Sequence, residues 1–299
     1  MKSNAPVAKK KVGEYNIKEK IGSGSYGIVY KASKLSDPFS YAAKVMPLTA
    51  FGKETRVEML KNEVRASKKA NHLNLVKLVD HISTSHNFYL IYEYCDLGSL
   101  FDYLKDHPEN RLEVNAIPII RQICKGYNQL HELGIIHRDI KPANVMLKSS
   151  PIGPIVKLAD FGFCKLFENC VVSEGMMTSH LGSGPFMSPE ILANEKYTYR
   201  TDIYSIGVTY YHILFNKYPF EGKSNADILK EIVKGTIEFD MRINKVSEYS
   251  IDFIVKCLKF KQEDRAKMEQ VMKHPLMNMG IKDILASPIK IDIVKATII

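Results

Sequence analysis

The sequence predicts an α+β protein in which a small, mostly antiparallel β lobe precedes a larger helical lobe. Two observations lead to this fold class. Short runs of β-branched and aromatic residues fill the first third of the chain, and helical spacing of apolar residues dominates after Asp96-Leu97-Gly98. Because the 299 residues are 45% hydrophobic, they can bury a substantial core, which excludes a mainly disordered chain.

The small lobe is expected at residues 15–93, after a flexible basic arm at residues 1–14. Its helix, at Glu54–Ala70, follows from apolar residues at helical spacing. The strands, which follow from β-branched and aromatic runs, are expected at Tyr15–Ile21, Ile28–Ala32, Tyr41–Met46, Leu75–Ile82 and Phe88–Tyr94.

A hinge at residues 94–98 leads into the large lobe, residues 99–279. A loop of about thirty residues, Asp160–Glu190, has almost no periodicity, and so long a loop in a compact domain is usually functional. A helix that begins near Thr201 is apolar on all sides and should be buried. Ligands favour the cleft between two such lobes. The other elements expected are a helix at Val114–Leu133 and strands at Val145–Leu147 and Val156–Leu158.

The final segment, residues 280–299, is rich in isoleucine. Ile281, Ile284 and Leu285 are expected to dock on the large lobe. The end at 297–299 indicates either a docked tail or a truncated chain, and truncation is the favoured interpretation.

The charge balance is basic, since 42 Lys and Arg minus 33 Asp and Glu gives +9. Such an excess suits nucleic acid, an anionic membrane surface or phosphate-bearing ligands. The lysines are dispersed and no nucleic-acid-binding motif appears, so a nucleic-acid partner is not expected, whereas peripheral membrane contact stays open.

No apolar run reaches the length of about 18 residues that a transmembrane helix needs. The N-terminus lacks the apolar stretch of a signal peptide. Five cysteines without a C-x-x-C pair indicate a reducing cytosol or nucleus, and a cytoplasmic location is the one we predict.

Three glycines, Gly22, Gly24 and Gly27, form the pattern G-x-G-x-x-G. Glycine lets a backbone fold closely over phosphates and present its N–H groups. Alone, the pattern also fits a hairpin turn. A dinucleotide-binding fold would need a helix after the glycines, but Val29-Tyr30-Lys31 is typical of a strand.

Lys44 lies inside an apolar strand, where a charge is costly unless it is paired or faces a ligand. Glu63, on the apolar side of the predicted helix, could be its partner. A lysine at the solvent edge of the strand is the competing interpretation.

The stretch His137–Asn144 places Asp139, Lys141 and Asn144 in one loop before an apolar strand. Asp139 can accept a proton from a hydroxyl, Lys141 can neutralise charge on a phosphoryl group, and Asn144 can bind a metal ion. A solvated charged loop is the alternative. Asp160, in Asp-Phe-Gly after the next strand, is a carboxylate suited to Mg²⁺.

The glycine loop, Lys44, Glu63, His-Arg-Asp, Asp-Phe-Gly and the Pro-Glu pair ending at Glu190 together resemble the signature set of eukaryotic protein kinases. The resemblance runs from Tyr15 to Met279. It implies the two-lobed protein kinase fold and transfer of the γ-phosphoryl group of ATP to protein hydroxyls. The spacing of Lys141 is similar to that of serine/threonine kinases, and Phe163 directly after Asp-Phe-Gly is similar to kinases that prefer serine.

The resemblance also implies a role for each matching residue. Asp139 would be the catalytic base, with Lys141 beside it. Lys44 would bind the α- and β-phosphates and pair with Glu63. Mg²⁺ would be held by Asn144 and Asp160. The ATP-binding residues implied are Ile21, Gly22, Gly24, Gly27, Val29, Ala42, Lys44, the gatekeeper Tyr92, Glu93, Cys95 and Met146.

The subfamily is left open between two readings of the same motifs. Asp-Phe-Gly-Phe-Cys, the insertion at 149–154 and Glu-Tyr-Cys at the hinge resemble the autophagy-initiating kinases, and calcium/calmodulin-type kinases are the alternative. A kinase-fold scaffold without activity would need a missing group among the catalytic residues, and none is missing. Ala143 offers no carboxylate at a position that kinases selecting basic peptides often use.

Ser67 departs from the family pattern, because the family places an apolar residue one turn after Glu63. We hypothesise that the helix is weakly held in its active position and needs phosphorylation or a partner; a local repacking without consequence is the alternative. Arg138 implies that an activating kinase phosphorylates the loop Asp160–Glu190. The candidate phosphorylation sites are Ser173, Thr178 and Ser179. Two further departures are Tyr204, for the usual tryptophan, and Ser183, for threonine.

Overall fold

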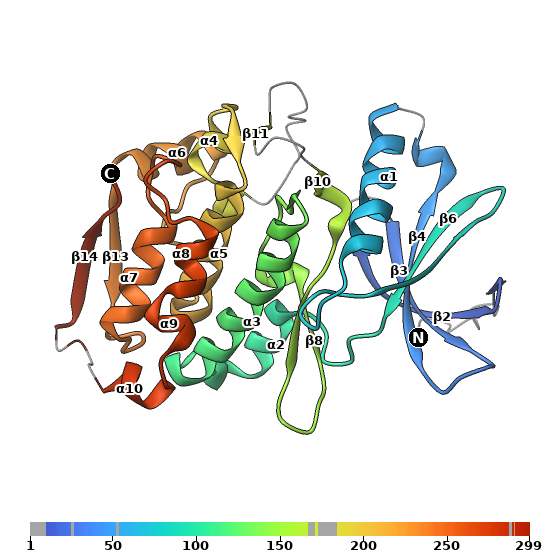
Figure 1. Ribbon diagram of the computed structural model, residues 1–299, viewed down its shortest axis with the longest axis horizontal. Coiled ribbons are helices and arrows are strands. Elements are labelled where there is room, and N and C mark those ends of the chain that lie inside the picture. The colour runs from blue at the N-terminus through green and yellow to red at the C-terminus, as the bar shows by residue number, and fades with distance from the viewer. Residues whose placement is uncertain are drawn as a thin grey trace, which may run out of the picture.

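The computed structural model has the two lobes that the sequence predicts, so the α+β fold class is confirmed (Figure 1). Figure 1 shows the strands of the small lobe on one side and the helices of the large lobe on the other. No helix in the described part of the chain is long and apolar enough to cross a membrane. The structure describes residues 10–24, 27–51, 54–166, 171–172, 184–286, 289 and 291–299.

The small lobe is a six-stranded antiparallel sheet in the order β1-β2-β3-β4-β6-β5. Successive side chains along a strand point to opposite faces of the sheet. Tyr41 and Ala43 are buried in the core of the small lobe, whereas Ala42 and Lys44 point to the opposite face. The strands are β1 (Lys10–Val12), β2 (Tyr15–Gly24), β3 (Gly27–Lys34), β4 (Ser40–Pro47), β5 (Leu78–Ser83) and β6 (Asn87–Glu93).

The first strand lies in the segment that the sequence assigns to a flexible arm. Lys10 pairs with Ile17, and Val12 pairs with Tyr15. Val12 and Tyr15 are both buried in the core of the small lobe. The prediction of a flexible arm is therefore wrong for residues 10–12, because one apolar side chain and a turn at Gly13 bring this short segment back onto the sheet.

Helix α1 (Glu54–Lys69) covers the side of the sheet that faces the large lobe (Figure 1). It packs against the short 3₁₀ helix η4 (Phe161–Phe163) and the strand β10 (Lys165–Leu166), both of the large lobe. The helix begins and ends within a residue of the predicted bounds. A further 3₁₀ helix, η1 (Leu48–Phe51), precedes it.

The large lobe is built around helix α5 (Arg200–Phe215), in which every residue from 201 to 215 is buried. The expectation of a buried helix near Thr201 is confirmed. Beside α5 run α3 (Glu113–Glu132) and α7 (Glu248–Cys257). The other α-helices are α2 (Leu100–Asp106), α4 (Pro189–Leu192), α6 (Asn225–Val233), α8 (Met268–Lys273), α9 (Pro275–Asn278) and α10 (Ile281–Leu285).

Short strand pairs fix the loops of the large lobe. β8 (Val145–Lys148) pairs with β9 (Ile155–Leu158), and β7 (Ile135–Ile136) pairs with β10. Of the loop Asp160–Glu190, β11 (Val171–Val172) pairs with β12 (Tyr197–Thr198). Ser173, Thr178, Ser179 and Ser183 lie outside the described residues. The remaining 3₁₀ helices are η2 (Pro108–Arg111), η3 (Pro142–Asn144) and η5 (Gly184–Phe186).

The C-terminal segment is docked on the large lobe. β14 (Ile293–Thr297) pairs antiparallel with β13 (Thr236–Asp240), and the backbone N–H of Ile298 donates to the carbonyl of Gly235. Ile284 and Ile298 are buried. The structure therefore shows a docked tail, because the isoleucines find both a strand edge and a core, while truncation after Ile299 stays a prediction.

Candidate active site

The three glycines lie on the paired strands β2 and β3. Gly24 pairs with Gly27 at the end of β2 and β3. A Cβ on Gly27 would collide with the backbone carbonyl of Val45 in β4, so only glycine fits there. Because a strand and not a helix follows the glycines, the dinucleotide-binding alternative is excluded. Ser25 and Tyr26, between Gly24 and Gly27 in the sequence, lie outside the described residues.

Lys44 is buried and bridges the two lobes. Its Nζ donates to Glu63 Oε1 of α1 at 2.7 Å and to Asp160 Oδ1 at 2.8 Å. The pairing expected between Lys44 and Glu63 is therefore present, and the solvent-edge alternative is wrong because Lys44 is only 7% exposed.

The three charges shift one another's pKa values. Burial works against the charge of Lys44, but Glu63 and Asp160 outweigh it and raise the pKa of Lys44 well above its usual value. Burial also disfavours the charged form of Asp160, but the positive charge of Lys44 outweighs it and lowers the pKa of Asp160. Burial raises the pKa of Glu63, an effect that Lys44 opposes. Lys44 is thus held as a cation that both carboxylates stabilise.

The loop before β8 brings three predicted residues together. Lys141 Nζ lies 3.0 and 2.8 Å from the two carboxylate oxygens of Asp139. Asn144 Nδ2 donates to Asp139 Oδ2 at 2.6 Å and to the Asp139 carbonyl at 2.9 Å. Since Asn144 uses its nitrogen toward Asp139, its amide oxygen is turned away from that carboxylate. Asp139 is 5% exposed, so the alternative of a solvated charged loop is wrong.

Asp202 of α5 binds the backbone of the loop that carries Asp139. Its two carboxylate oxygens accept the backbone N–H groups of His137 and Arg138, each at 2.7 Å. Arg138 has a φ of 68°, in the left-handed region that non-glycine residues seldom adopt. Asp160 also has a positive φ, 60°. Such strain collects at functional sites because the surrounding contacts enforce it.

The predicted adenine-binding residues lie on β2, β3, β4, β6, the hinge and β8. Ala42 pairs with Tyr92 across β4 and β6, and Val29 pairs with Lys44 across β3 and β4. The backbone N–H of Glu93 donates to the carbonyl of Lys77. Of the two backbone groups of Glu93, only the carbonyl oxygen is therefore left for a ligand. Ile21 on β2 is 41% exposed, Cys95 is buried in the hinge, and Met146 lies on β8.

Comparison with known proteins identifies this arrangement. The family model described as the protein kinase domain matches residues 15–277. The chain belongs to the protein kinase family. Its curated relatives are of the eukaryotic serine/threonine type.

Three of these relatives are similarly distant from the chain. Myosin light chain kinase 3 from Danio rerio is 33% identical over 261 residues, which cover 87% of this chain and 35% of the relative. Serine/threonine-protein kinase ATG1c from Arabidopsis thaliana is 30% identical over 271 residues, 89% of this chain and 36% of the relative. Calcium-dependent protein kinase 5 from Plasmodium falciparum is 34% identical over 256 residues, 85% of this chain and 44% of the relative. The kinase chain thus spans less than half the length of each.

The donor set of the kinase site suits a magnesium ion that is bound together with a nucleotide. Among the residues that the structure describes, no cluster of three or more His, Cys, Asp or Glu side chains could hold a metal by itself. Asn144 and Asp160 provide an amide and a carboxylate oxygen. Mg²⁺ in proteins typically takes one or two carboxylates and completes its shell with phosphates and water. The residues therefore fit this ion.

Sequence reasoning missed several contacts around the kinase site. The Glu93 side chain pairs with Lys157 at 2.8 Å and Lys148 at 3.0 Å, which ties the end of β6 to β8 and β9. The Tyr92 hydroxyl donates to Glu63 Oε1 at 3.2 Å and lies 3.4 Å from Ser67 Oγ. These pairs are far apart in sequence, and no local pattern marks them.

Glu190, at the end of the predicted loop, forms a buried ion pair with Arg265. Arg265 Nη1 and Nη2 donate to the two carboxylate oxygens of Glu190 at 2.7 and 3.0 Å. Tyr204, in place of the usual tryptophan, is buried, and its ring lies 5.1 Å from the Arg265 guanidinium carbon. The smaller aromatic side chain thus still packs on the ion pair.

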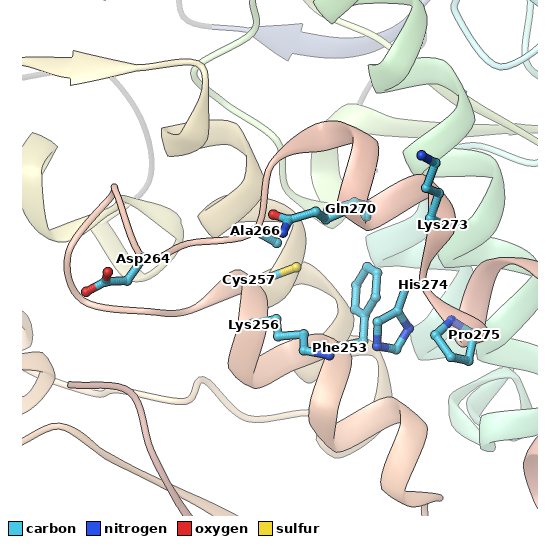
Figure 2. A pocket seen from close by; sticks show the side chains of 10 residues that line it. Phe253, Lys256, Cys257, Asp264, Ala266, Gln270, Lys273, His274 and Pro275 are labelled. Atoms are coloured by element: carbon cyan, nitrogen blue, oxygen red, sulfur yellow. The ribbon is translucent and has the colours of Figure 1, made fainter.

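A separate pocket of about 450 Å³ lies between α7 and α8, together with residues directly before and after α8. Figure 2 shows Phe253, Cys257 and His274 at this pocket, which is lined by no residue of the predicted kinase site. Two of its polar groups share one partner: His274 Nε2 and Lys256 Nζ both donate to Asp252.

Proposed function

We propose that the chain catalyses transfer of the γ-phosphoryl group of ATP to hydroxyl groups of proteins, with serine preferred over threonine. The observation that carries the proposal is the position of Asp139, which is buried beneath Lys141 and Asn144. Membership of the serine/threonine kinase family supports it.

Asp139 is the group that would accept the proton of the substrate hydroxyl. Its carboxylate is fixed by Asn144 and by Lys141, so it is oriented before the substrate arrives. Lys141 lies beside it and would stabilise negative charge on the phosphoryl group in transfer. The loop is held in this shape by Asp202.

Lys44 would bind the α- and β-phosphates, which Gly22, Gly24 and Gly27 would cover, and Glu63 would keep its ammonium group in place. Mg²⁺ would be held by Asn144 and Asp160, and when bound it would neutralise charge on the phosphate oxygens. The adenine ring would lie among the residues around Tyr92 and the hinge. The other residues expected to bind ATP are Ile21, Val29, Ala42, Glu93, Cys95 and Met146.

The test is phosphorylation of a degenerate serine and threonine peptide library with radiolabelled ATP and Mg²⁺. The wild-type chain should label serine peptides more than threonine peptides, and Asp139→Asn and Asp160→Asn should each reduce labelling at least a hundredfold, in keeping with loss of a catalytic base or a metal ligand. A wild-type chain that binds ATP but labels no peptide would support the scaffold alternative.

We propose that an activating kinase phosphorylates the loop Asp160–Glu190 at Ser173, Thr178 or Ser179, which raises activity. Arg138 supports this proposal: it directly precedes Asp139, and its guanidinium donates to the hydroxyl of Tyr197, next to β11 of that loop. Phosphatase treatment should lower activity, and mass spectrometry should locate the lost phosphate. Full activity of a dephosphorylated sample would contradict it.

We propose an autophagy-initiating-like subfamily and a cytoplasmic location. The hinge and loop motifs and the similarity to ATG1c support the subfamily, while the similarities to myosin light chain kinase 3 and calcium-dependent protein kinase 5 support the calcium/calmodulin-type alternative. The peptide library separates the two. With Ala143 beside the site, we expect no selection for arginine near the phosphorylated residue, and strong selection for arginine would favour the alternative.

A further inference from the structure

A chain of hydroxyl groups connects α1 to the sheet behind the Lys44–Glu63 pair. Tyr92 on β6 places its hydroxyl 3.2 Å from Glu63 Oε1 and 3.4 Å from Ser67 Oγ. The same Oε1 accepts Lys44 Nζ at 2.7 Å. Glu63 and Ser67 are four residues apart on α1 and so share one helix face. Each is only 2% exposed.

The direction of these hydrogen bonds follows from the chemistry of the groups. An ionised carboxylate only accepts, so Tyr92 donates its proton to Glu63. Having given its only proton to Glu63, the Tyr92 oxygen must accept from Ser67. Burial first, and the Glu63 charge second, raise the pKa of Tyr92 well above its usual value, so the phenol keeps the proton that it donates. The chain runs from Ser67 through Tyr92 to Glu63.

Few of the described side chains of helix α1 are buried. Those that are buried are Glu63, Ala66 and Ser67; Leu60 and Val64 are only partly buried. Ala66 belongs to the core of the large lobe but contributes a single methyl group. Among these described side chains little apolar area is buried, so polar contacts carry a larger share of what positions this part of the helix.

We propose that Tyr92 and Ser67 are positioning residues whose hydroxyl groups hold α1 where Glu63 pairs with Lys44. The proposal rests on the function proposed above. It also gives Ser67 a role opposite to the hypothesis of a weakly held helix: the serine supplies the last donor of the chain. Without the chain, Glu63 would move away and leave Lys44 paired with Asp160 alone.

The first experiment compares Tyr92→Phe with Tyr89→Phe, a matched variant on the same strand. Tyr89 faces the core of the small lobe, so its substitution controls for loss of a buried tyrosine hydroxyl. Amide hydrogen exchange over residues 63–70 should accelerate about tenfold in Tyr92→Phe, as expected for loss of a charge-assisted hydrogen bond, and stay unchanged in Tyr89→Phe. Unchanged protection in Tyr92→Phe would overturn the proposal, and this readout holds even if the chain phosphorylates nothing.

The second experiment asks whether Tyr92 acts through Glu63. In kinase assays with the best library peptide, Tyr92→Phe should lower kcat about tenfold with little change in the KM for ATP. On a Glu63→Ala background, the same substitution should change neither kcat nor the exchange of residues 63–70. An effect confined to the KM for ATP, or one that persists fully without Glu63, would mean that Tyr92 acts through nucleotide contact or packing, and would overturn the proposal.

Ser67 provides the third experiment, which separates the two accounts of that residue. Ser67→Ala should accelerate exchange in residues 63–70 by about threefold, since it removes one neutral hydrogen bond. Ser67→Leu removes the same donor and should not raise activity. If Ser67→Leu raises activity, the weakly held helix is correct and the hydroxyl chain is not what positions α1.

Discussion

Helices α1 and α5 each contain sixteen residues, yet they are attached to the molecule in opposite ways. In α5 every residue from 201 to 215 is buried. In α1 the buried described side chains are two polar residues and one alanine. Both helices serve the same site: α5 fixes the loop of Asp139 through Asp202, and α1 brings Glu63 to Lys44.

The difference teaches how the site divides its tasks. Asp139, which is proposed to act on the substrate hydroxyl, lies in a loop that is bound to α5 through Asp202. Helix α5 cannot shift without opening the core of the large lobe. Glu63, which pairs with Lys44, lies on a helix whose described side chains include only three that are buried. Control of activity is therefore expected to act on α1, and loss of stability to arise from changes around α5.

The largest expected effect lies at Arg265, which anchors α5 to Glu190. Its side chain is fully buried and also donates to the carbonyl groups of Lys259, Arg200 and Phe260. Arg265→Ala should lower the free energy of unfolding by about 3 to 5 kcal/mol, because it leaves the Glu190 carboxylate buried without a partner. Denaturant unfolding checks this. The double variant Arg265→Leu with Glu190→Gln, which removes both charges, should recover part of the loss.

The second effect separates stability from activity at Asp202. Asp202→Asn keeps one acceptor for the two backbone N–H groups that the carboxylate now binds, so one of them loses its partner. The free energy of unfolding should fall by about 2 to 3 kcal/mol. Peptide phosphorylation should fall by at least tenfold, since the loop from His137 to Asp139 loses its support. Wild-type activity in a destabilised Asp202→Asn would contradict the proposed role of α5 as the base of the site.

Much of this comparison could be anticipated from the sequence, and part of it could not. The buried helix near Thr201 and the pair of Lys44 and Glu63 follow from apolar patterning and from motif order. The turn of residues 10–12 back onto the sheet depends on a single apolar residue, Val12, which carries no periodic signal. The bond between Tyr92 and Glu63 depends on how a strand and a helix 29 residues apart meet, which no local pattern encodes.

The third effect tests how tightly α5 is packed. A Cβ on Gly207 would approach Cys257 Cβ to 2.7 Å and Leu258 Cδ2 to 3.0 Å. Alanine is the better helix former by about 1 kcal/mol, but overpacking costs more. Gly207→Ala should therefore lower the free energy of unfolding by about 1 to 2 kcal/mol, measured by denaturant unfolding. A stabilised variant would show that α5 has more room than its burial indicates.

The smallest expected effect is a dependence of stability on pH that arises from His212 in α5 and not from α1. His212 is buried in α5, where its ring stacks on Tyr218 at 5.0 Å and its Nδ1 lies 3.3 Å from the carbonyl of Lys217. A carbonyl only accepts, so Nδ1 carries the proton of the neutral ring. Burial, and then the positive charge of Arg111, lower the pKa of His212, although the Lys217 carbonyl opposes the shift.

Because the unfolded chain binds a proton at His212 at higher pH than the folded chain, the stability from its neutral form is complete above about pH 6.5 and is lost as the pH falls below that value. His212→Phe cannot be protonated and should show a smaller loss of stability between about pH 7 and pH 5 than the wild type. His72, His131 and His274 also have lowered pKa values and would retain part of the dependence. Since α1 contains no histidine, hydrogen exchange in residues 63–70 should respond to this pH change less than exchange in residues 205–215. Equal pH slopes in His212→Phe and the wild type would show that the neutral ring of His212 is not what acid removes from α5.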